Sequence, residues 1–575
     1  MNIRQLLDSR VSAALITAGA PDNTSAVIKQ SNRAEFGHYQ ANGVMGAAKQ
    51  LKMNPRELAG KVLAALDLND ISEKVEIAGP GFLNIHLKPE WLAQQLELAL
   101  STDKLNISQV DTPQTVVIDY SAPNLAKEMH VGHLRSTIIG DALVRVLEFI
   151  GHKVIRQNHV GDWGTQFGML LAHLNSLKAS GTELSMQLSD LEGFYRDAKK
   201  RFDDEEGFAE NARDYVVKLQ AGDADCLALW QQFIDISLQH CDDIYRRLNV
   251  LLTRDDVMPE SAYNHDLANV IKDLNSAGLL TEDQGAQCVF LEKFKDKDDK
   301  ILPAIVQKSD GGYLYATTDL AALRYRHNEL QANRVLYFVD ARQSLHLNQV
   351  FAISKAANFV PANMQLEHMA FGTMMGKNGK PFKTRDGGTV KLIDLLKEAE
   401  QRAFDLVSEK NPDLSEDERK NVAHTVGIGA VKYADLSKNR SSDYIFNWGT
   451  MLSFEGNTAP YLQYAYARIQ SIFRKAGEID GSATLYLNEA AEKQLATKLL
   501  QLPEAIEVVI KDGTPNILCN YLFELAGNFM SFYEACPILK AEDDIKKSRL
   551  KLAKLTAQTL DTGLGLLGIE TLDKM

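Results

Sequence analysis

A short β-branched strand pattern is followed, after a turn, by a helical pattern that opens with two histidines. Residues 115–118 read Thr-Val-Val-Ile, which predicts a buried parallel strand. Apolar residues then recur every four positions and predict an amphipathic helix; they are Leu134, Ile138, Ala142, Val146 and Ile150. Between the two patterns stands His130-Val131-Gly132-His133. This order predicts a strand that leads into a helix whose first turn carries two imidazoles on one face.

The position of the histidine pair suits phosphate chemistry. The first turn of a helix offers free backbone N–H groups and the positive end of the helix dipole, so an anion binds well there. Imidazole N–H groups can follow negative charge onto phosphate oxygens during a displacement. The alternative is that His130 and His133 only cap the helix or lie half-buried. Their place between a strand and a helix favours a phosphate site.

Composition limits the class of protein. The chain has 575 residues, enough for three or four domains, and its 45% hydrophobic and 24% charged residues are ordinary for a globular protein. The formal net charge of −13 argues against a general polyanion-binding protein, although a local basic patch could still hold RNA. The acidic surplus fits a cationic substrate, but surface solubility explains it equally well.

Cysteine spacing and hydropathy indicate a compartment. The five cysteines are widely spaced and form no C-x-x-C pair, so neither a zinc site nor a disulfide framework is expected. The N-terminal residues open an amphipathic helix rather than a signal peptide, and no apolar run approaches membrane-spanning length. These features predict a cytoplasmic protein without a membrane partner and without a metal held by its side chains.

Strand and helix patterns divide the chain into four predicted regions. Residues 1–110 predict a small α+β domain. Residues 111–390 alternate strands with helices, the pattern of an α/β domain, and include a long, mostly helical insertion between the second and third strands. Residues 391–450 predict a helical connector, and residues 451–575 a helical bundle.

Individual elements follow from the same periodicities. In the α/β region, strands are expected after the first one at residues 154–160, 335–339 and 366–371. From residue 394 onward the pattern is helical nearly to the end, with helices expected at residues 394–409, 458–475, 490–511, 517–535 and 545–566.

A glycine- and lysine-rich stretch at residues 376–388 is a second candidate phosphate-binding element. A flexible backbone with several cations can close over a triphosphate and neutralise charge on a departing pyrophosphate. Basic surface loops are common, so the stretch is weak evidence without the histidine pair.

The residues around the histidines resemble a known signature. Ser121, Pro123, Asn124, Lys127 and the Arg135-Ser136 pair complete the pattern S-x-P-N-x-x-K-x-x-H-x-G-H-x-R-S. This pattern resembles the HIGH signature of class I aminoacyl-tRNA synthetases, in the form found in arginyl-tRNA synthetases. The resemblance extends through nearly the whole chain.

The lysine-rich stretch resembles a degenerate KMSKS loop of the same class. Lys380 takes the first lysine place, Lys383 the second and Thr384 that of the final hydroxyl, while Pro381 and Phe382 replace the usual Met-Ser. In arginyl enzymes a lysine just before the histidines can supply or supplement the phosphate contacts, and Lys127 occupies that place. Which lysine contributes most is left open.

The resemblance implies a fold and a reaction. The fold is a Rossmann-like parallel-sheet catalytic domain with an α+β N-terminal domain that binds the tRNA elbow and an all-α anticodon-binding bundle. The reaction is ATP-dependent activation of L-arginine to arginyl-adenylate and transfer to the 3′ end of arginine tRNA, with release of AMP and pyrophosphate. Mg²⁺ is expected to help, the enzyme to be a monomer, and activation to wait for bound tRNA. The residues implied in catalysis are His130, His133, Lys127, Lys380 and Lys383.

An arginine substrate requires carboxylates for its guanidinium. From the residues alone, Asp319 is read as a first-turn carboxylate that offsets a helix dipole. By the resemblance, Asp319 binds the guanidinium, Tyr315 packs or hydrogen-bonds beside it, and Gln343 helps to hold the substrate. Asp119 and Asn124 match positions that contact the polar end groups of the amino acid. Whether His346 is a core histidine or a neighbour of the active site stays open.

The resemblance also assigns residues to ATP and tRNA. Residues implied in ATP binding are His130, Gly132, His133, His368, Phe371, Gly372 and Thr384. Tyr461, Tyr464 and Arg468 share a helix face that could stack anticodon bases, although an aromatic stripe is more often core. Phe82 and Asn84 resemble positions that face the tRNA elbow, although a buried strand phenylalanine is the ordinary alternative.

Rival functions are a class I synthetase for another amino acid, a nucleotidylyltransferase that does not act on tRNA, and a non-catalytic tRNA-binding paralogue. The Tyr315, Asp319 and Gln343 set and the helical bundle argue against the first two. The intact histidines and lysines argue against the third.

Overall fold

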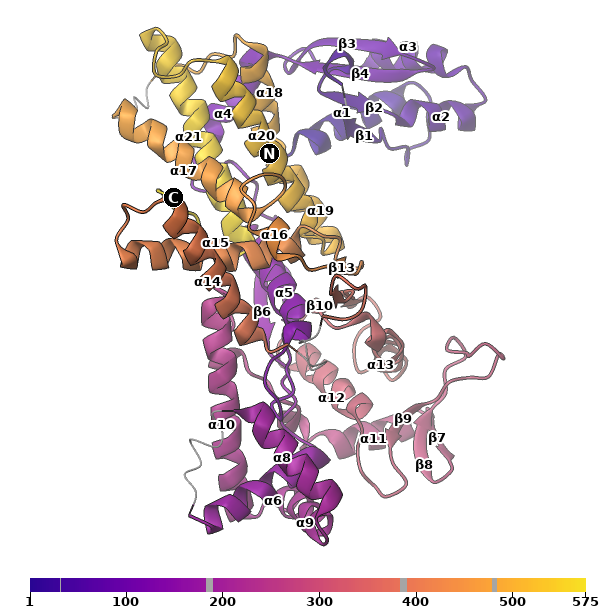
Figure 1. Ribbon diagram of the computed structural model, residues 1–575. Coiled ribbons are helices and arrows are strands. Elements are labelled where there is room, and N and C mark those ends of the chain that lie inside the picture. Colours follow the sequence, from indigo (N-terminus) through magenta and orange to yellow (C-terminus); the bar gives the residue numbers. More distant parts are fainter. Residues whose placement is uncertain (32, 182–189, 383–389, 478–482) are drawn as a thin grey trace. The chain divides into compact units, whose positions relative to one another are not determined.

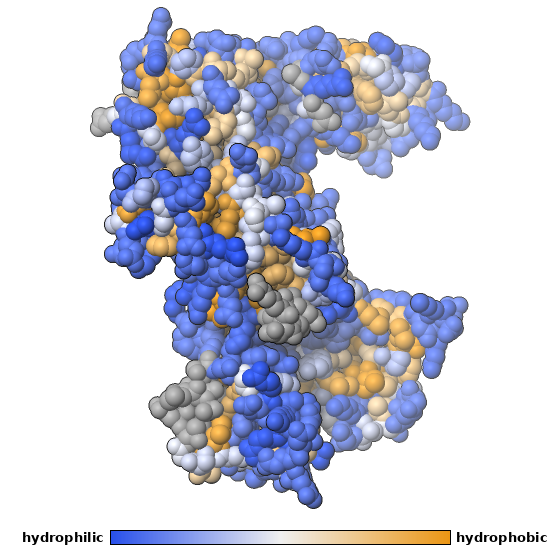
Figure 2. Space-filling view, viewed as in Figure 1, coloured by the Kyte–Doolittle hydropathy of each residue, from blue (hydrophilic) through white to orange (hydrophobic). Residues whose placement is uncertain are grey.

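The computed structural model describes residues 1–31, 33–181, 190–382, 390–477 and 483–575. These residues divide into two compact units (Figure 1). The first unit consists of Met1–Gln109, Ser453–Gly565 and Glu570–Met575, and the second of Val110–Leu452 and Leu566–Ile569. On the face seen in Figure 2, hydrophilic side chains predominate over both units, as the charged composition leads one to expect. Among the described residues, no helix is both long enough and apolar enough to cross a membrane.

A four-stranded parallel sheet forms the centre of the second unit. Its strand order is β11-β10-β5-β6, and every neighbouring pair is parallel. The strands are β5 (Thr115–Asp119), β6 (Lys153–Gln157), β10 (Arg334–Tyr337) and β11 (Gln365–His368). Val116, Val117 and Ile118 are fully buried, because helices cover both faces of such a sheet. The predicted α/β class and parallel sheet are confirmed, although β6 and β11 end three residues earlier than expected.

The carboxyl ends of the four strands are level. Asp119 pairs in register with Gln157 on one side and with Tyr337 on the other, and Tyr337 pairs with His368. Helix α5 (Val131–Phe149) follows β5, and helix α13 (Ser344–Ala356) follows β10. In open α/β sheets, ligands bind beyond the carboxyl ends of the strands, where such helices begin.

The insertion between β6 and β10 is mainly helical, as predicted. Its helices are α6 (Thr165–Ala179), α8 (Leu191–Asp204), α9 (Phe208–Gln220), α10 (Ala224–Arg247) and α11 (Leu267–Ser276), and helix α12 (Tyr315–Asn328) precedes β10. The insertion also contains a three-stranded antiparallel sheet that the sequence did not predict, formed by β7 (Leu280–Asp283), β8 (Ala286–Val289) and β9 (Ala304–Gln307). Its first turn uses Gln284 and Gly285, whose φ values of 51° and 82° suit a two-residue hairpin turn.

Residues after β11 complete the second unit with helices α14 (Leu392–Lys410), α15 (Glu416–Leu436) and α16 (Trp448–Met451). Ser415 and Glu418 form a capping box that begins α15. Strand β12 (Met374–Met375) pairs in parallel with β13 (Tyr444–Ile445). The expectation of a purely helical pattern after residue 394 is therefore wrong at β13, which is too short to give a periodic signal.

The N-terminal part of the first unit is an α+β domain, as predicted. Its antiparallel sheet has the order β1-β2-β4-β3. Its elements are α1 (Ile3–Thr17), β1 (Ile28–Gln30), β2 (Tyr39–Ala41), α2 (Gly43–Leu51), α3 (Pro55–Ala65), β3 (Ser72–Ala78), β4 (Phe82–Leu87) and α4 (Pro89–Leu100).

The C-terminal part of the first unit is a helical bundle. Its helices are α17 (Ala459–Ala476), α18 (Ala490–Leu499), α19 (Leu502–Asp512), α20 (Asn516–Ala535) and α21 (Asp543–Leu566). The prediction of a single helix at residues 490–511 is wrong, because the helix is interrupted between α18 and α19. Pro503 stands in the first turn of α19, where its missing N–H costs no helical hydrogen bond.

Candidate active site

The two signature histidines are held by backbone hydrogen bonds at the start of α5. His130 is the N-cap residue, and its Nδ1 accepts from the Gly132 N–H at 3.0 Å. His133 Nδ1 accepts from the His130 N–H at 3.0 Å, and the two ring centroids lie 4.0 Å apart. Since each Nδ1 accepts a hydrogen bond, each neutral ring carries its own proton on Nε2. Both imidazoles therefore have an Nε2–H group to offer a phosphate oxygen.

Burial keeps both imidazoles neutral. Burial lowers the pKa of His133 to about 3, and the neighbouring His130 ring acts in the same direction. Burial also lowers the pKa of His130, and the cations of Lys127 and Arg342 add to that effect, while Glu192 opposes it. At neutral pH the pair therefore acts as two uncharged donors near cationic side chains.

Close packing at the turn explains its glycine and its hydroxyl residues. A Cβ on Gly132 would lie 2.6 Å from His130 Cε1, so only glycine lets that ring fold over the turn. Ser136 Oγ donates to the Phe338 carbonyl at 2.6 Å, which ties α5 to the end of β10. Thr137 Oγ1 donates to the His133 carbonyl at 2.8 Å.

The residues that follow the lysine-rich loop lie beside the histidines. Lys391 pairs with His130 in an antiparallel bridge, and Leu392 N donates to the Met129 carbonyl at 2.9 Å. At the other end of the loop, Lys380 is exposed, and its carbonyl accepts from the Gly376 N–H at 2.7 Å. Lys383 and Thr384 lie outside the described residues. The structure thus places the segment that begins α14 beside the histidine turn.

Helix α8 of the insertion contacts both lysines that flank the histidine turn. Lys127 Nζ lies 4.2 Å from the centroid of the Tyr195 ring. Lys391 Nζ pairs with Asp190 at 2.9 Å and with Glu128 at 3.2 Å. Burial alone would lower the pKa of Lys391, but these two carboxylates outweigh burial and raise it. Lys391 therefore stays charged.

A second group of polar side chains surrounds Asp319 on α12. Asp319 Oδ2 lies 2.5 Å from His346 Nε2, and Oδ1 lies 3.8 Å from His159 Nε2. Burial lowers the pKa of His346, but the hydrogen bond to Asp319 outweighs it and raises the pKa overall. Asp319 is the fifth residue of α12, beyond its first turn, so the helix-dipole alternative is wrong. His346 is a neighbour of Asp319 rather than a core residue.

Glu260 is the residue that the sequence analysis missed. It begins the short 3-10 helix Glu260–Tyr263, and burial raises the pKa of its carboxyl to about 8, with further increases from Asp319 and Asp162. Burial raises the pKa of Tyr315, and the charge of Glu260 adds to it, so this 62% exposed ring borders the same group. Among the described residues no cation pairs with Glu260. Glu260 and Asp319 thus lie close enough for the charge of Asp319 to raise the pKa of Glu260.

Asp119 and Asn124 have partners within the protein. The buried carboxylate of Asp119 accepts from Arg326 Nη2 at 2.6 Å, and Arg326 Nε donates to Gln157 Oε1 at 2.6 Å. Asn124 Oδ1 accepts from the Ala126 N–H at 2.9 Å. Gln343 is exposed at the end of the 3-10 helix Ala341–Gln343. Contacts of these three residues with an amino acid remain predictions.

The residues implied in adenine binding lie at the end of β11 and just beyond it. His368 Nε2 lies 2.9 Å from the Val339 carbonyl, and its Nδ1 lies 3.2 Å from Ser344 Oγ, so both ring nitrogens have partners. Phe371 is buried, and its carbonyl accepts from the Ala341 N–H at 3.2 Å. A Cβ on Gly372 would lie 2.7 Å from the Ser442 carbonyl oxygen. This packing accounts for all three residues, and their contact with adenine remains a prediction.

Comparison with family models covers nearly the whole chain. Residues 95–448 match the model of the class I tRNA synthetase (R) catalytic domain. Residues 462–575 match the DALR anticodon binding domain, and residues 2–87 match the arginyl tRNA synthetase N-terminal domain. An arginine–tRNA ligase of Hahella chejuensis is 64% identical over 578 residues, which is 100% of both chains.

The chain belongs to the arginyl-tRNA synthetase family.

Solved structures agree with this assignment. The chain is similar to the arginyl-tRNA synthetase of Plasmodium falciparum, with a TM-score of 0.87 and 31% identity over 100% of this chain and 99% of that one. It is also similar to the Thermus thermophilus arginyl-tRNA synthetase, with a TM-score of 0.85 and 25% identity over 100% of both chains. The matching models and structures support the three-part arrangement of an N-terminal domain, a class I catalytic domain and a helical anticodon-binding domain.

The residues that are expected to contact tRNA lie in the first unit. Asn84 is buried and accepts from Gln40 Nε2 at 2.8 Å, whereas Phe82 is only half-buried. On α17, Tyr464 is 42% exposed, the Tyr461 ring lies 5.6 Å from that of Phe523, and the Arg468 guanidinium lies 4.6 Å over the Tyr533 ring. Tyr464 is thus the most exposed of these three aromatic residues, while Asn84 has a structural partner already.

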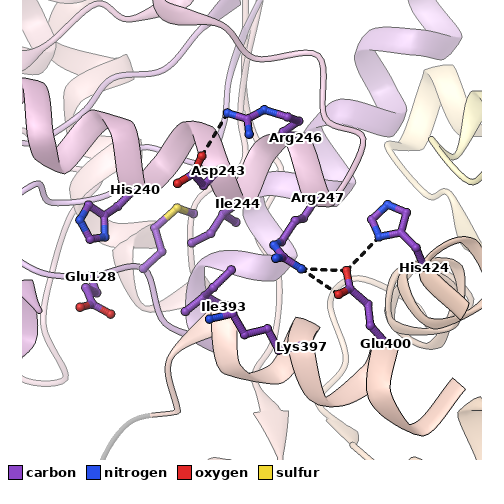
Figure 3. A pocket seen from close by; sticks show the side chains of 11 residues that line it. Glu128, His240, Asp243, Ile244, Arg246, Arg247, Ile393, Lys397, Glu400 and His424 are labelled. Carbon is purple, nitrogen blue, oxygen red and sulfur yellow. Dashed lines mark hydrogen bonds and ion pairs between the residues drawn. The ribbon is translucent and has the colours of Figure 1, made fainter. Parts of the chain in front are cut away.

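A cavity of the synthetase domain is lined in part by Glu128, just before the histidine turn (Figure 3). It has a volume of about 640 Å³, and Met129 forms part of its wall. Its charges largely pair with one another: Arg247 with Glu400 at 2.8 Å, His424 with Glu400 at 2.9 Å, and Arg246 with Asp243 at 3.0 Å. A triphosphate requires uncompensated cations, so this cavity is a poor candidate for the ATP site.

Proposed function

We propose that this arginine–tRNA ligase activates L-arginine with ATP at the histidine turn and the carboxylate pocket described above, and then transfers it to the 3′ end of arginine tRNA. The observation that supports this most is the placement of two opposite environments at one sheet edge. Neutral imidazole donors and cations gather at the start of α5, and two carboxylates gather beside α12. Such an arrangement suits an anionic phosphate at one end and a cationic side chain at the other.

The first step is displacement at the α-phosphate. The arginine carboxylate attacks the α-phosphorus, an oxygen–phosphorus bond forms, and the bond to the departing pyrophosphate breaks. His130 and His133 donate their Nε2–H groups to phosphate oxygens as charge moves onto them, while Lys127, Lys380 and Lys383 neutralise the pyrophosphate. No side chain acts as a covalent nucleophile, so catalysis is positioning and electrostatic stabilisation.

Asp319 and Glu260 recognise the guanidinium. A carboxylate accepts two parallel hydrogen bonds from a guanidinium, and two carboxylates on different sides hold its plane in one orientation. The guanidinium would also favour ionisation of Glu260, whose pKa burial raises to about 8. A lysine substrate has a point charge and cannot bind both carboxylates in this way. Tyr315, Gln343, Asp119 and Asn124 are proposed to complete the amino-acid site.

The second step transfers the arginyl group. The terminal ribose hydroxyl of the tRNA attacks the activated carbonyl carbon and displaces AMP. We propose that Tyr461, Tyr464 and Arg468 contact the anticodon loop and that Phe82 and Asn84 face the tRNA elbow. His368, Phe371 and Gly372 are proposed to line the adenine site, with Gly132 and Thr384 also near the nucleotide.

We propose Mg²⁺ as a helper that the nucleotide itself brings. Among the described residues, no group of three or more His, Cys, Asp or Glu side chains could hold a metal ion. Mg²⁺ fits this situation, because it commonly binds through substrate phosphates and water with few protein ligands. When bound, it would neutralise charge on the pyrophosphate. We also propose a monomeric, cytoplasmic enzyme, and the five free, buried cysteines agree with a reducing compartment.

The test is ATP–pyrophosphate exchange with each standard amino acid, with and without arginine tRNA. Of the standard amino acids, we expect only arginine to support exchange, and only when the tRNA is present. Exchange with another amino acid would favour a different class I synthetase. Absence of exchange together with tight tRNA binding would favour a non-catalytic paralogue. Robust exchange without tRNA would contradict the proposed dependence on tRNA.

A further inference from the structure

One tyrosine of the insertion reaches the turn that precedes the signature. Tyr245 lies near the end of α10 and is 3% exposed. Its hydroxyl lies 2.8 Å from Ser121 Oγ, and Asn158 Nδ2 donates to it at 3.0 Å. Ser121 lies two residues after the end of β5, and Asn158 directly follows β6, so a single hydroxyl joins three chain segments.

The turn at Ser121 needs such support. Ser121 and Ala122 have φ values of 69° and 43°, a left-handed conformation that residues with a side chain adopt only under constraint. Two backbone bonds help to hold it: Ser121 N donates to Ser136 Oγ at 2.9 Å, and Ala122 N donates to Asn158 Oδ1 at 3.0 Å. This turn carries the chain from β5 toward Asn124, Lys127 and the histidines.

The hydroxyls form a connected chain that ends at His133. Ser121 Oγ lies 2.9 Å from Thr137 Oγ1, which lies 2.8 Å from the His133 carbonyl. Thr137 Oγ1 is the donor toward both Ser121 Oγ and the His133 carbonyl, so its one proton is shared between them. The Tyr245 hydroxyl accepts from Asn158 and can donate to Ser121.

Through Asn158, the Tyr245 hydroxyl is also connected to the amino-acid pocket. Asn158 is fully buried and directly precedes His159, whose Nε2 lies 3.8 Å from Asp319 Oδ1. The Asn158 carbonyl accepts from Met258 N at 3.1 Å, and Glu260 N donates to the Val160 carbonyl at 3.0 Å. The segment that carries Glu260 is therefore paired with the segment that Asn158 begins.

The end of α10 is fixed to the helix that carries the histidines. Arg145 Nη2 donates to the Asn249 carbonyl at 2.7 Å, and Leu251 N donates to Asp141 Oδ1 at 2.7 Å. Both Arg145 and Asp141 lie on α5. Tyr245 is thus held at a constant position relative to α5.

We propose that Tyr245 is a positioning residue that sets the spacing between the phosphate end and the arginine end of the active site. Its hydroxyl contacts neither substrate; it acts through Ser121 and Thr137 on the histidine turn and through Asn158 on the segment facing Asp319. This inference rests on the proposed roles of the histidines and of Asp319. Because a small misplacement of reacting groups slows a displacement more than it weakens binding, the hydroxyl governs kcat rather than KM.

The test is Tyr245→Phe, which keeps the ring and removes the hydroxyl. In arginine-dependent ATP–pyrophosphate exchange with arginine tRNA present, we expect kcat to fall about tenfold or more while KM for arginine and for ATP changes less than about threefold. Tyr521→Phe is the matched control, because it removes another buried hydroxyl, bonded to the Lys498 and Leu499 carbonyls on α18 and at its end. It should leave kcat unchanged. A kcat within twofold of wild type for Tyr245→Phe overturns the proposal.

A double-mutant cycle tests the route. If Tyr245 acts through Ser121, then Ser121→Ala lowers kcat, and Tyr245→Phe adds little to it. Full additivity overturns the route. Should Tyr245→Phe fail to fold, Ser121→Ala decides alone, and an unchanged kcat counts against the proposal. His133→Ala distinguishes failure of this proposal from failure of the proposed phosphate site. If kcat of His133→Ala is also unchanged, the phosphate site is wrongly assigned. If kcat falls greatly in His133→Ala alone, only the role of Tyr245 is rejected.

Discussion

The histidine turn and the proposed arginine pocket lie in the same compact unit but are built in different ways. The turn is local: His130 and His133 bond to backbone groups within four residues of each other, and burial leaves both rings uncharged. The pocket is assembled from distant segments, since Glu260, Asp319 and His346 come from three separate elements. One end depends on helix geometry, and the other depends on the tertiary fold.

This difference extends to charge. The donors of the turn are neutral and need no counter-ion, so they can follow charge that appears only during the reaction. The carboxylates of the pocket repel one another, and the pKa of Glu260 is raised in consequence, after the larger effect of burial. The pocket therefore gains most from a cation that is already charged in the ground state. We expect changes in the turn to affect mainly kcat, and changes in the pocket mainly KM for arginine.

The largest effect is expected at the turn. His133→Ala removes the proposed donor to the α-phosphate, and loss of one such donor typically lowers kcat about 100- to 1,000-fold. Single-turnover adenylate formation with tRNA present measures it. The affinity for tRNA should be nearly unchanged, because His133 lies on the nucleotide side; a large loss of tRNA binding instead would place the histidines elsewhere. His133→Asn, which keeps an N–H donor, should recover part of the rate.

The next effect is expected in the pocket. Asp319→Asn replaces the proposed charged acceptor of the guanidinium by a neutral one and should raise KM for arginine about 100-fold, since truncating a buried charged pair costs several kcal/mol. KM for ATP should stay the same. Asp273→Asn is the control, because Asp273 pairs with Arg324 at 2.7 Å on the surface and should have no effect on either KM. An unchanged KM for arginine in Asp319→Asn would remove Asp319 from the pocket.

The histidine turn could be predicted from the sequence, because its strand, its helix and its histidines are neighbours in the chain. The β-branched run gave β5, the period of four gave α5, and the histidines fell at the helix start. The break before Pro503 was also readable, since proline rarely sits inside a helix, although the helical period on both sides concealed it. The sheet β7-β8-β9 was harder, because its strands are four residues long and partly polar.

For the arginine pocket, the sequence predicts the kind of side chain required but not every residue that supplies it. The need for carboxylates around a guanidinium was clear, but nothing near Glu260 in the chain distinguishes it from other acidic residues of the insertion. Its identity depends on its distance from Asp319 and on its burial, which exist only in the fold. The same holds for His346, whose partner lies on another helix. Periodicity predicts elements, and it does not predict which elements meet.

The pH dependence of arginine binding tests whether ionisation of Glu260 controls the pocket. Burial and nearby carboxylates raise its pKa to about 8, so below pH 8 the free enzyme holds this group mostly protonated and uncharged. If only the ionised form binds guanidinium, affinity rises with pH up to about 8 and then levels off. The expected change in KM for arginine is a decrease of about 25-fold between about pH 6.5 and 8.5.

Glu260→Gln should remove most of that slope. The variant should resemble the wild type most closely at low pH, where Glu260 is already neutral, and should bind arginine more weakly at high pH. The hydrogen bond to Asp319 raises the pKa of His346, and loss of that proton would free Asp319 for the guanidinium, so a slope from His346 would have the same direction. A full wild-type slope in Glu260→Gln would mean that another group controls binding. The turn offers a contrast, because the pKa of His133 is about 3 and adds no slope in this range.

The smallest effect is expected where the insertion meets the turn. Tyr195→Leu removes the ring that lies 4.2 Å from Lys127 Nζ, and a cation–π contact of this kind contributes about 0.5–1 kcal/mol, or roughly a two- to fivefold effect. We expect KM for ATP to rise by about that factor while KM for arginine stays the same. Phe202→Leu is the matched control, because it removes the contact with Lys199 at 5.4 Å on the same helix. Equal effects of the two variants would show that α8 only stabilises the fold, whereas an effect of Tyr195→Leu alone would make Lys127 part of the phosphate end.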